Sequence, residues 1–153
     1  TKYWIEYICK RFENTGKHIS PELAEEICRL VDNHSSYVQQ LSWLLWIRTI
    51  NTATTEQLSY ALEDLLDQNN ILFQSETENL SAYQMNFLKA IVDGIHTKFS
   101  SKEVISKYNL GTSANIVRLK NALLQKELIE TNGKEIVLAD PVFGVWFKKE
   151  MLY

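Results

Sequence analysis

The segment LIETNGKEIVL, residues 128–138, decides how the second half of the chain folds. Two short runs, 128–131 and 135–138, alternate in polarity on either side of Asn132-Gly133. Alternation is typical of strands, and Asn-Gly between two such runs is the strongest short-range signal for a tight turn. The sequence therefore predicts a β-hairpin at this position.

Three predicted helices precede this hairpin. Ser81, with Gln84 three residues later, has the capping-box pattern, and so does the run SSKE at residues 100–103. After a turn at Gly111, Thr112 or Ser113 is expected to cap a third helix that ends near residue 126. Three helices followed by a hairpin are the order of a winged helix-turn-helix domain. Asp140-Pro141 then ends the hairpin and begins a terminal helix.

The first half of the chain reads as four helices, at about residues 2–14, 21–31, 36–50 and 55–74. Their apolar residues recur at the i, i+3, i+4 and i+7 spacing of an amphipathic helix. The third helix is so apolar that we expect it to be central in its bundle. Trp43 and Trp46 on that helix, and Trp146 near the C-terminus, are expected to pack in the core.

A polar run at residues 75–79 marks the expected domain boundary. The predicted fold is mostly α, with a four-helix bundle in residues 1–77 and a winged helix-turn-helix domain in residues 78–153. The first part has 6 basic and 11 acidic side chains, whereas the second has 10 basic and 8 acidic ones. Only the second part is therefore suited to approach a polyanion such as DNA.

Composition limits the classes of function. Apolar residues make up 45% of the chain, and no apolar run approaches the length of a membrane helix, so no membrane partner is expected. The two cysteines are interpreted as reduced core residues, which indicates a cytoplasmic protein. The three histidines lack metal-ligand spacing, and no metal site is expected.

The sequence contains no recognisable catalytic motif. Gly16-Lys17 lacks the upstream glycine and the following Ser or Thr of a phosphate-binding loop, and it follows a helix instead of a strand. No nucleophile or acid–base constellation has the required spacing. We expect that the chain is not an enzyme on its own.

A possible DNA-reading face lies on the third helix of the winged helix. Asn and Gln side chains pair with adenine and Arg with guanine in the major groove, while lysines contact phosphates. The face offers a single cation, however, and a winged helix used only for protein packing is the alternative. The candidate DNA-binding residues are Lys102, Ser113, Asn115, Arg118, Asn121, Gln125 and Lys134.

Five segments, in this order and spacing, resemble one known family. They are YICKRFENTGKHI at 7–19, VDNHSSYVQQL at 31–41, LSAYQMNFLKAI at 80–91, YNLGTSAN at 108–115 and DPVFGVWF at 140–147. The set is similar to the archaeal-type P-loop ATPases of the AAA+/STAND superclass, which are common in archaea and Bacteroidetes. In that family the second segment usually has proline after the histidine, where this chain has Ser35.

This resemblance implies a C-terminal fragment of an ATPase, made of a helical lid and a winged helix. An absent N-terminal core would carry the Walker motifs and bind ATP and Mg²⁺, and the fragment itself would need no cofactor. In the lid, His34, Tyr37 and Gln40 are candidates for residues near the nucleotide. The expected partner is the parent's own ATPase core, and double-stranded DNA or another protein are further candidates. The alternatives are a winged-helix transcriptional regulator and a protein-interaction scaffold.

Overall fold

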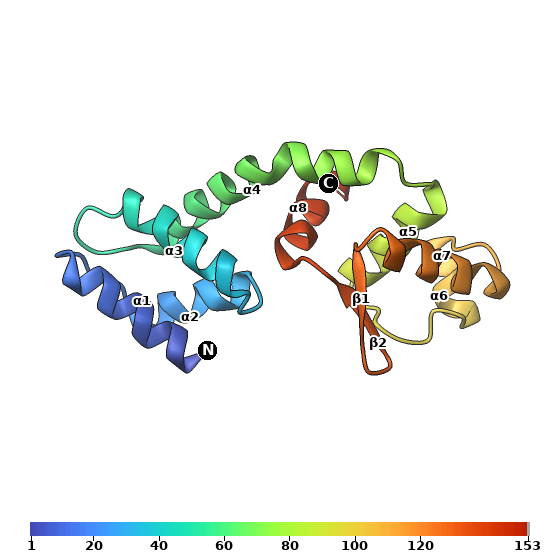
Figure 1. The fold of residues 1–153 in the computed structure, drawn as a ribbon, viewed down its shortest axis with the longest axis horizontal. Helices are drawn as coiled ribbons and strands as arrows, with labels where there is room; N and C mark the ends of the chain where they lie inside the picture. Colours follow the sequence, from blue (N-terminus) through green and yellow to red (C-terminus); the bar gives the residue numbers. More distant parts are fainter. Residues whose placement is uncertain (153) are drawn as a thin grey trace. The chain divides into compact units, whose positions relative to one another are not determined.

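The computed structural model describes residues 1–152 and consists of helices and one β-hairpin (Figure 1). It divides into two compact units, Thr1–Asn70 and Ile71–Tyr153. This confirms the predicted fold class, a helical bundle followed by a winged helix-turn-helix with a short hairpin and a terminal helix. Within the described residues, no helix has both the length and the apolar character that crossing a membrane requires.

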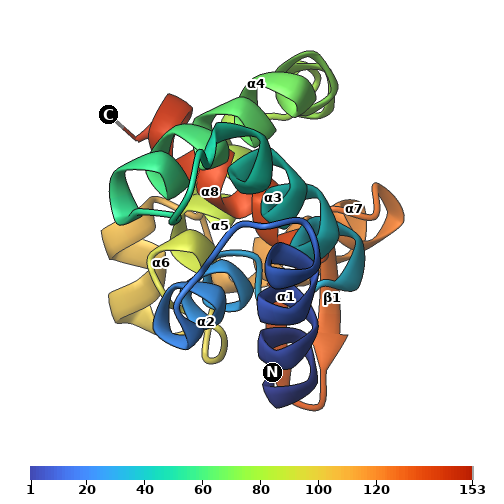
Figure 2. The ribbon, with the colours of Figure 1, turned by 90° about the vertical axis from the view of Figure 1, so that its left-hand side faces the viewer.

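The first unit contains α1 (Lys2–Asn14), α2 (Pro21–Leu30), α3 (Ser35–Arg48) and the first part of α4 (Thr55–Glu78). Figure 2 shows α1 and α3 side by side, and α2 contacts both of them. Ser20 caps α2 as expected, because its side-chain oxygen accepts a hydrogen bond from the Leu23 amide. The side chains fully buried in this core include Phe12, Ile19, Ile27, Leu41, Leu45 and Leu65.

Helix α3 has one buried face and one exposed face. Leu41 and Leu45 are 0% exposed, whereas Trp43 is 58% and Ile47 50% exposed. The prediction that α3 is central, with Trp43 in the core, is therefore wrong. The physical reason is that the neighbouring helices cover one face of α3, formed by Val38, Leu41, Leu44 and Leu45, and leave Trp43 and Ile47 largely exposed.

Hydrogen bonds hold the loop between α3 and α4 in place at several positions. His18, in the α1–α2 loop, donates its amide to the Asn51 carbonyl at 2.8 Å and accepts from the Ala53 amide at 2.8 Å. The Thr49 hydroxyl donates to the Leu45 carbonyl. Two backbone bonds of the kind found between strands thus join this connection to the α1–α2 loop.

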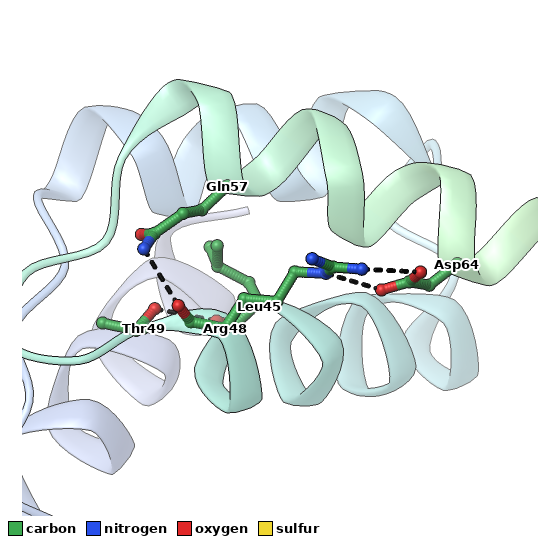
Figure 3. A network of polar contacts seen from close by, with 5 residues as sticks. All are labelled: Leu45, Arg48, Thr49, Gln57 and Asp64. Atoms are coloured by element: carbon green, nitrogen blue, oxygen red, sulfur yellow. Dashed lines mark hydrogen bonds and ion pairs between the residues drawn. The ribbon is translucent and has the colours of Figure 1, made fainter.

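Gln57 joins the end of α3 to the start of α4 (Figure 3). Its side-chain amide donates to the Arg48 carbonyl at 2.9 Å, and its oxygen accepts from the Thr54 amide at 3.0 Å. The Thr54 hydroxyl in turn accepts from the Gln57 amide, which completes the predicted capping box. About two turns further along α4, Asp64 pairs with the Arg48 guanidinium at 2.7 and 3.0 Å, and this hydrogen bond raises the Arg48 pKa.

Gln57→Ala is expected to lower the free energy of unfolding by about 1–2 kcal/mol, because it removes both side-chain bonds. Gln57→Glu keeps the acceptor for the Thr54 amide and loses the donor to the Arg48 carbonyl, so its loss should be intermediate. Urea denaturation followed by far-UV circular dichroism measures both variants. Equal losses in the two would show that the bond from the Thr54 amide contributes nothing, and an unchanged stability of Gln57→Glu would show the same for the bond to Arg48.

Helix α4 continues to Glu78, beyond its predicted end near residue 74. Phe73 is fully buried, and its ring centroid lies 5.4 Å from that of Phe143 and 5.6 Å from that of Trp146. The Thr77 side chain is also buried and donates its hydroxyl to the Gln74 carbonyl at 3.0 Å. The polar run 75–79 is thus mostly helical because one of its faces packs into the second unit, and the two units divide within α4.

The second unit continues with α5 (Ala82–Val92), α6 (Lys102–Tyr108), α7 (Ser113–Gln125), β1 (Ile129–Asn132), β2 (Glu135–Leu138) and α8 (Pro141–Met151). Ser81 and Gln84 form the predicted capping box of α5. Helix α6 is capped by Ser101 and not by Ser100, so the expected pairing of Ser100 with Glu103 is wrong. Asp140 caps α8 through bonds to two amides.

The hairpin forms where predicted, but Asn132 belongs to its first strand and not to the turn. Asn132 pairs with Glu135, which leaves Gly133-Lys134 as the two-residue loop. Gly133 has a φ of 64°, and glycine accepts this left-handed conformation without a steric cost. The Ile136 amide donates to the His96 carbonyl at 2.8 Å, which ties the hairpin to the segment before α6.

Candidate functional site

The helix-turn-helix is built from α6, a left-handed turn and α7. Asn109 and Gly111 both have positive φ, of 54° and 88°, and Leu110 between them is fully buried. The buried leucine anchors the turn in the core, while the two left-handed residues reverse the chain direction. A Cβ atom on residue 111 would lie 3.5 Å from the Tyr83 ring and 3.2 Å from the Asn115 amide nitrogen, so glycine is needed there for backbone and space.

Most of the predicted DNA-binding residues are exposed. Ser113, Arg118, Asn121 and Gln125 are exposed on α7, Lys102 is exposed at the start of α6, and Lys134 is exposed in the hairpin loop. Ile116, Leu119 and Leu123 fill the opposite, buried face of α7. The helix therefore presents one continuous solvent face and one core face, as the sequence predicted.

Asn115 does not point outward as predicted. It is half-buried, and its side-chain amide donates to the Leu110 carbonyl at 3.1 Å. The carbonyls of a helix-turn-helix turn lack helical partners, and an asparagine in the next first turn satisfies one of them. Asn115 is thus part of the turn and does not belong to the reading face.

The electrostatic character of the α7 face is weak. Arg118 is its one exposed cation among the described residues, and the neighbouring Val117 is apolar and 62% exposed. Phosphate recognition relies on several cations. The face is therefore mixed in chemistry, with one guanidinium, two amides and one aliphatic side chain.

The three candidate residues near a nucleotide lie at the start of α3. His34 occupies the N-cap position, and its ring centroid is 4.8 Å from that of Tyr37. The Gln40 amide donates to the Ser36 hydroxyl at 2.9 Å, which keeps it along the helix surface. The structure thus brings His34 and Tyr37 into ring contact, while Gln40 lies one turn further along.

A cavity of about 400 Å³ between α1 and α3 was not foreseen from the sequence. Trp43 and Trp46 form part of its wall, although the sequence analysis placed both in the core. No motif signals this cavity, because its walls come from helices about thirty residues apart. The lining residues are Tyr7, Ile8, Arg11, Phe12, Thr15, Gln39, Ser42, Trp43 and Trp46.

Reactive and metal-binding groups are scarce. Among residues 1–152, no three His, Cys, Asp or Glu side chains converge in a way that would hold a metal ion. Both cysteines are free, and burial raises the pKa of Cys9 and of Cys28, which disfavours the reactive thiolate.

The fold and the α6–α7 pair define a winged helix-turn-helix domain that follows a helical bundle. The family model described as "Probable winged helix domain" matches residues 71–149, and the chain belongs to this family. No curated protein shows significant sequence similarity to the chain.

A solved structure resembles both units together. It is a Walker-type ATPase of Pyrococcus abyssi, with a TM-score of 0.71 and 18% sequence identity. The similarity covers 97% of this chain and 41% of the ATPase chain. The chain thus shares the fold of a part of that ATPase and spans about two fifths of its length.

Proposed function

We propose that the chain is the regulatory C-terminal part of a P-loop ATPase, in which a helical lid is followed by a winged helix. The observation that carries this proposal is the structural similarity to the Walker-type ATPase, which covers 97% of the chain and therefore includes both the bundle and the winged helix. A winged helix alone is a widespread fold, whereas this bundle and winged helix in succession are a more specific combination.

In this role the chain does not hydrolyse ATP. The parent protein's Walker motifs bind ATP and Mg²⁺, and the bundle closes over the nucleotide with His34, Tyr37 and Gln40 nearest to it. The winged helix relays the nucleotide state to a partner, which is the ATPase core itself, DNA or another protein. We place this activity in the cytoplasm.

The coding sequence and the intact protein test this function. Upstream of residue 1 we expect a strand followed by Gly-x-x-x-x-Gly-Lys-Ser/Thr, and a gene without this motif contradicts the proposal. In the intact protein, His34→Ala is expected to weaken ATP binding about tenfold, which equilibrium titration measures. His18→Ala, also an exposed histidine of the first unit, is the matched control and should leave the affinity unchanged.

DNA binding by the winged helix is the second candidate function. The observation that favours it is the exposure of Arg118, Asn121 and Gln125 on one helix, with Lys134 in the hairpin loop. These side chains have the chemistry to read guanine and adenine and to contact phosphate.

For a DNA-binding winged helix, we expect the affinity for duplex DNA to fall at least about tenfold between 50 and 200 mM salt, because phosphate contacts release counterions. Arg118→Ala should weaken the binding further, while Lys149→Ala, which removes an exposed cation of α8, should change it little. Fluorescence anisotropy with a randomised labelled duplex measures both effects. Binding that is absent at 50 mM salt removes this second function and leaves the ATPase proposal intact.

A further inference from the structure

The wall formed by Trp46 in the α1–α3 cavity is held rigidly. The Lys17 ammonium lies 3.8 Å from the centroid of the indole ring and also donates to the Trp46 carbonyl at 2.7 Å. The indole N–H donates to the Thr15 hydroxyl at 2.8 Å. The Thr15 hydroxyl itself bonds to the Phe12 carbonyl at 2.9 Å. Each polar atom around this ring is therefore satisfied, and the ring is fixed before any ligand arrives.

Trp43 and Tyr7 supply further aromatic surface at the same cavity. Trp43 is 58% exposed, so the stability of the core does not explain it. Tyr7 is half-buried and is held by the edge of the Trp4 ring, with centroids 5.6 Å apart. Aromatic rings at one cavity offer faces for stacking, which favours a flat aromatic ligand over an aliphatic one.

The charge at the cavity is positive. Arg11 is the only charged residue among the described residues that line it, and no lining residue is acidic. Its guanidinium lies 5.6 Å from the centroid of Tyr7 and remains exposed to solvent. A guanidinium beside aromatic rings binds a carboxylate or a phosphate that is attached to a stacked ring.

We propose that this cavity binds a planar aromatic ring that carries an anionic group. The volume of about 400 Å³ lies in the range of small-molecule sites, which is about 300–1,000 Å³. The ring stacks on Trp43 and Tyr7 against the fixed wall of Trp46, and the anion pairs with Arg11. A mononucleotide and an aromatic carboxylate share this chemistry.

This site does not depend on the proposed ATPase function. It lies within the first unit, and His34, Tyr37 and Gln40 are not among its lining residues. Along α3, the cavity residues Gln39, Trp43 and Trp46 recur every three to four positions, and Tyr37 and Gln40 fall on a different face.

Isothermal titration calorimetry on the 153-residue chain tests the proposal with AMP, indole-3-acetate and adenosine. We expect AMP or indole-3-acetate to bind with a Kd below about 1 mM, and the tighter of the two identifies the source of the ligand. Adenosine, which lacks the anion, should bind less tightly than AMP. The proposal is overturned if neither anion binds in this range.

Single substitutions test whether the ligand binds in the α1–α3 cavity. Trp43→Ala should weaken the affinity about tenfold or more, as expected for the loss of one stacking partner. Arg11→Gln should weaken binding of the anions about fivefold and leave adenosine unchanged. Ile50→Ala and Lys10→Gln are matched exposed controls outside the cavity, and circular dichroism verifies that all variants fold. An affinity that Trp43→Ala leaves intact and His34→Ala abolishes would place the ligand elsewhere and refute the site.

Discussion

Phe73→Ala is expected to lower the free energy of unfolding of the second unit by about 3–5 kcal/mol, the usual cost of removing a buried aromatic ring. Phe73 is 0% exposed, and its ring contacts both Phe143 and Trp146 of α8. Alanine would leave a cavity between α4 and α8 that these large side chains cannot fill without changing rotamers. Urea denaturation followed by tryptophan fluorescence measures the loss, because Trp146 lies beside the deleted ring.

Leu72→Ala is the control for this variant. Leu72 is the adjacent residue of the same helix and is 55% exposed, so its truncation should change the stability by no more than about 0.5 kcal/mol. Equal losses for Phe73→Ala and Leu72→Ala would contradict the packing of α4 against α8.

Leu45→Ala is expected to destabilise the first unit by about 2–5 kcal/mol. Leu45 is 0% exposed and lies on the buried face of α3. Ile47→Ala, two residues further along, removes a side chain that is 50% exposed and should cost no more than about 0.5 kcal/mol. Thermal unfolding followed at 222 nm compares the two, and a large loss for Ile47→Ala would show that the exposed face of α3 is covered in solution.

The winged helix was predictable because its signals are local. Ser81 with Gln84, Gly111 and the Asn132-Gly133 pair each impose a cap or a turn through groups within three residues of one another. The pairing of Asn132 with Glu135 was not predicted, because strand register depends on pairing across the two strands and not on the turn residues alone.

The exposed face of α3 was not predictable in the same way. Trp43, Ile47 and the buried Leu44 are all apolar, so the sequence pattern does not distinguish the face that neighbouring helices cover. That distinction depends on the number of helices that pack around α3, which is a property of the tertiary structure. The end of α4 was misplaced for a related reason, since Phe73 packs against Phe143 of α8, which lies about seventy residues further along the chain.

The candidate sites also differ in whether local sequence or tertiary structure determines them. The exposure of Arg118 and Gln125 on α7 follows from helical periodicity and was predicted. The inward turn of Asn115 depends on the free Leu110 carbonyl, and the α1–α3 cavity depends on how two helices lie together. No spacing of residues in the sequence predicts the orientation of Asn115 or the position of this cavity.

The hydrogen bonds of the loop between α3 and α4 restrict the length that this loop can have. Surface loops ordinarily accept insertions and deletions, because their backbone groups turn to water. Here the backbone groups of Asn51 and Ala53 form hydrogen bonds with the backbone of His18. The Gln57 side chain reaches back across the loop and donates a hydrogen bond to the Arg48 carbonyl. A single added or lost residue would break these bonds together, so we expect this segment to be less tolerant of a change in length than an ordinary surface loop.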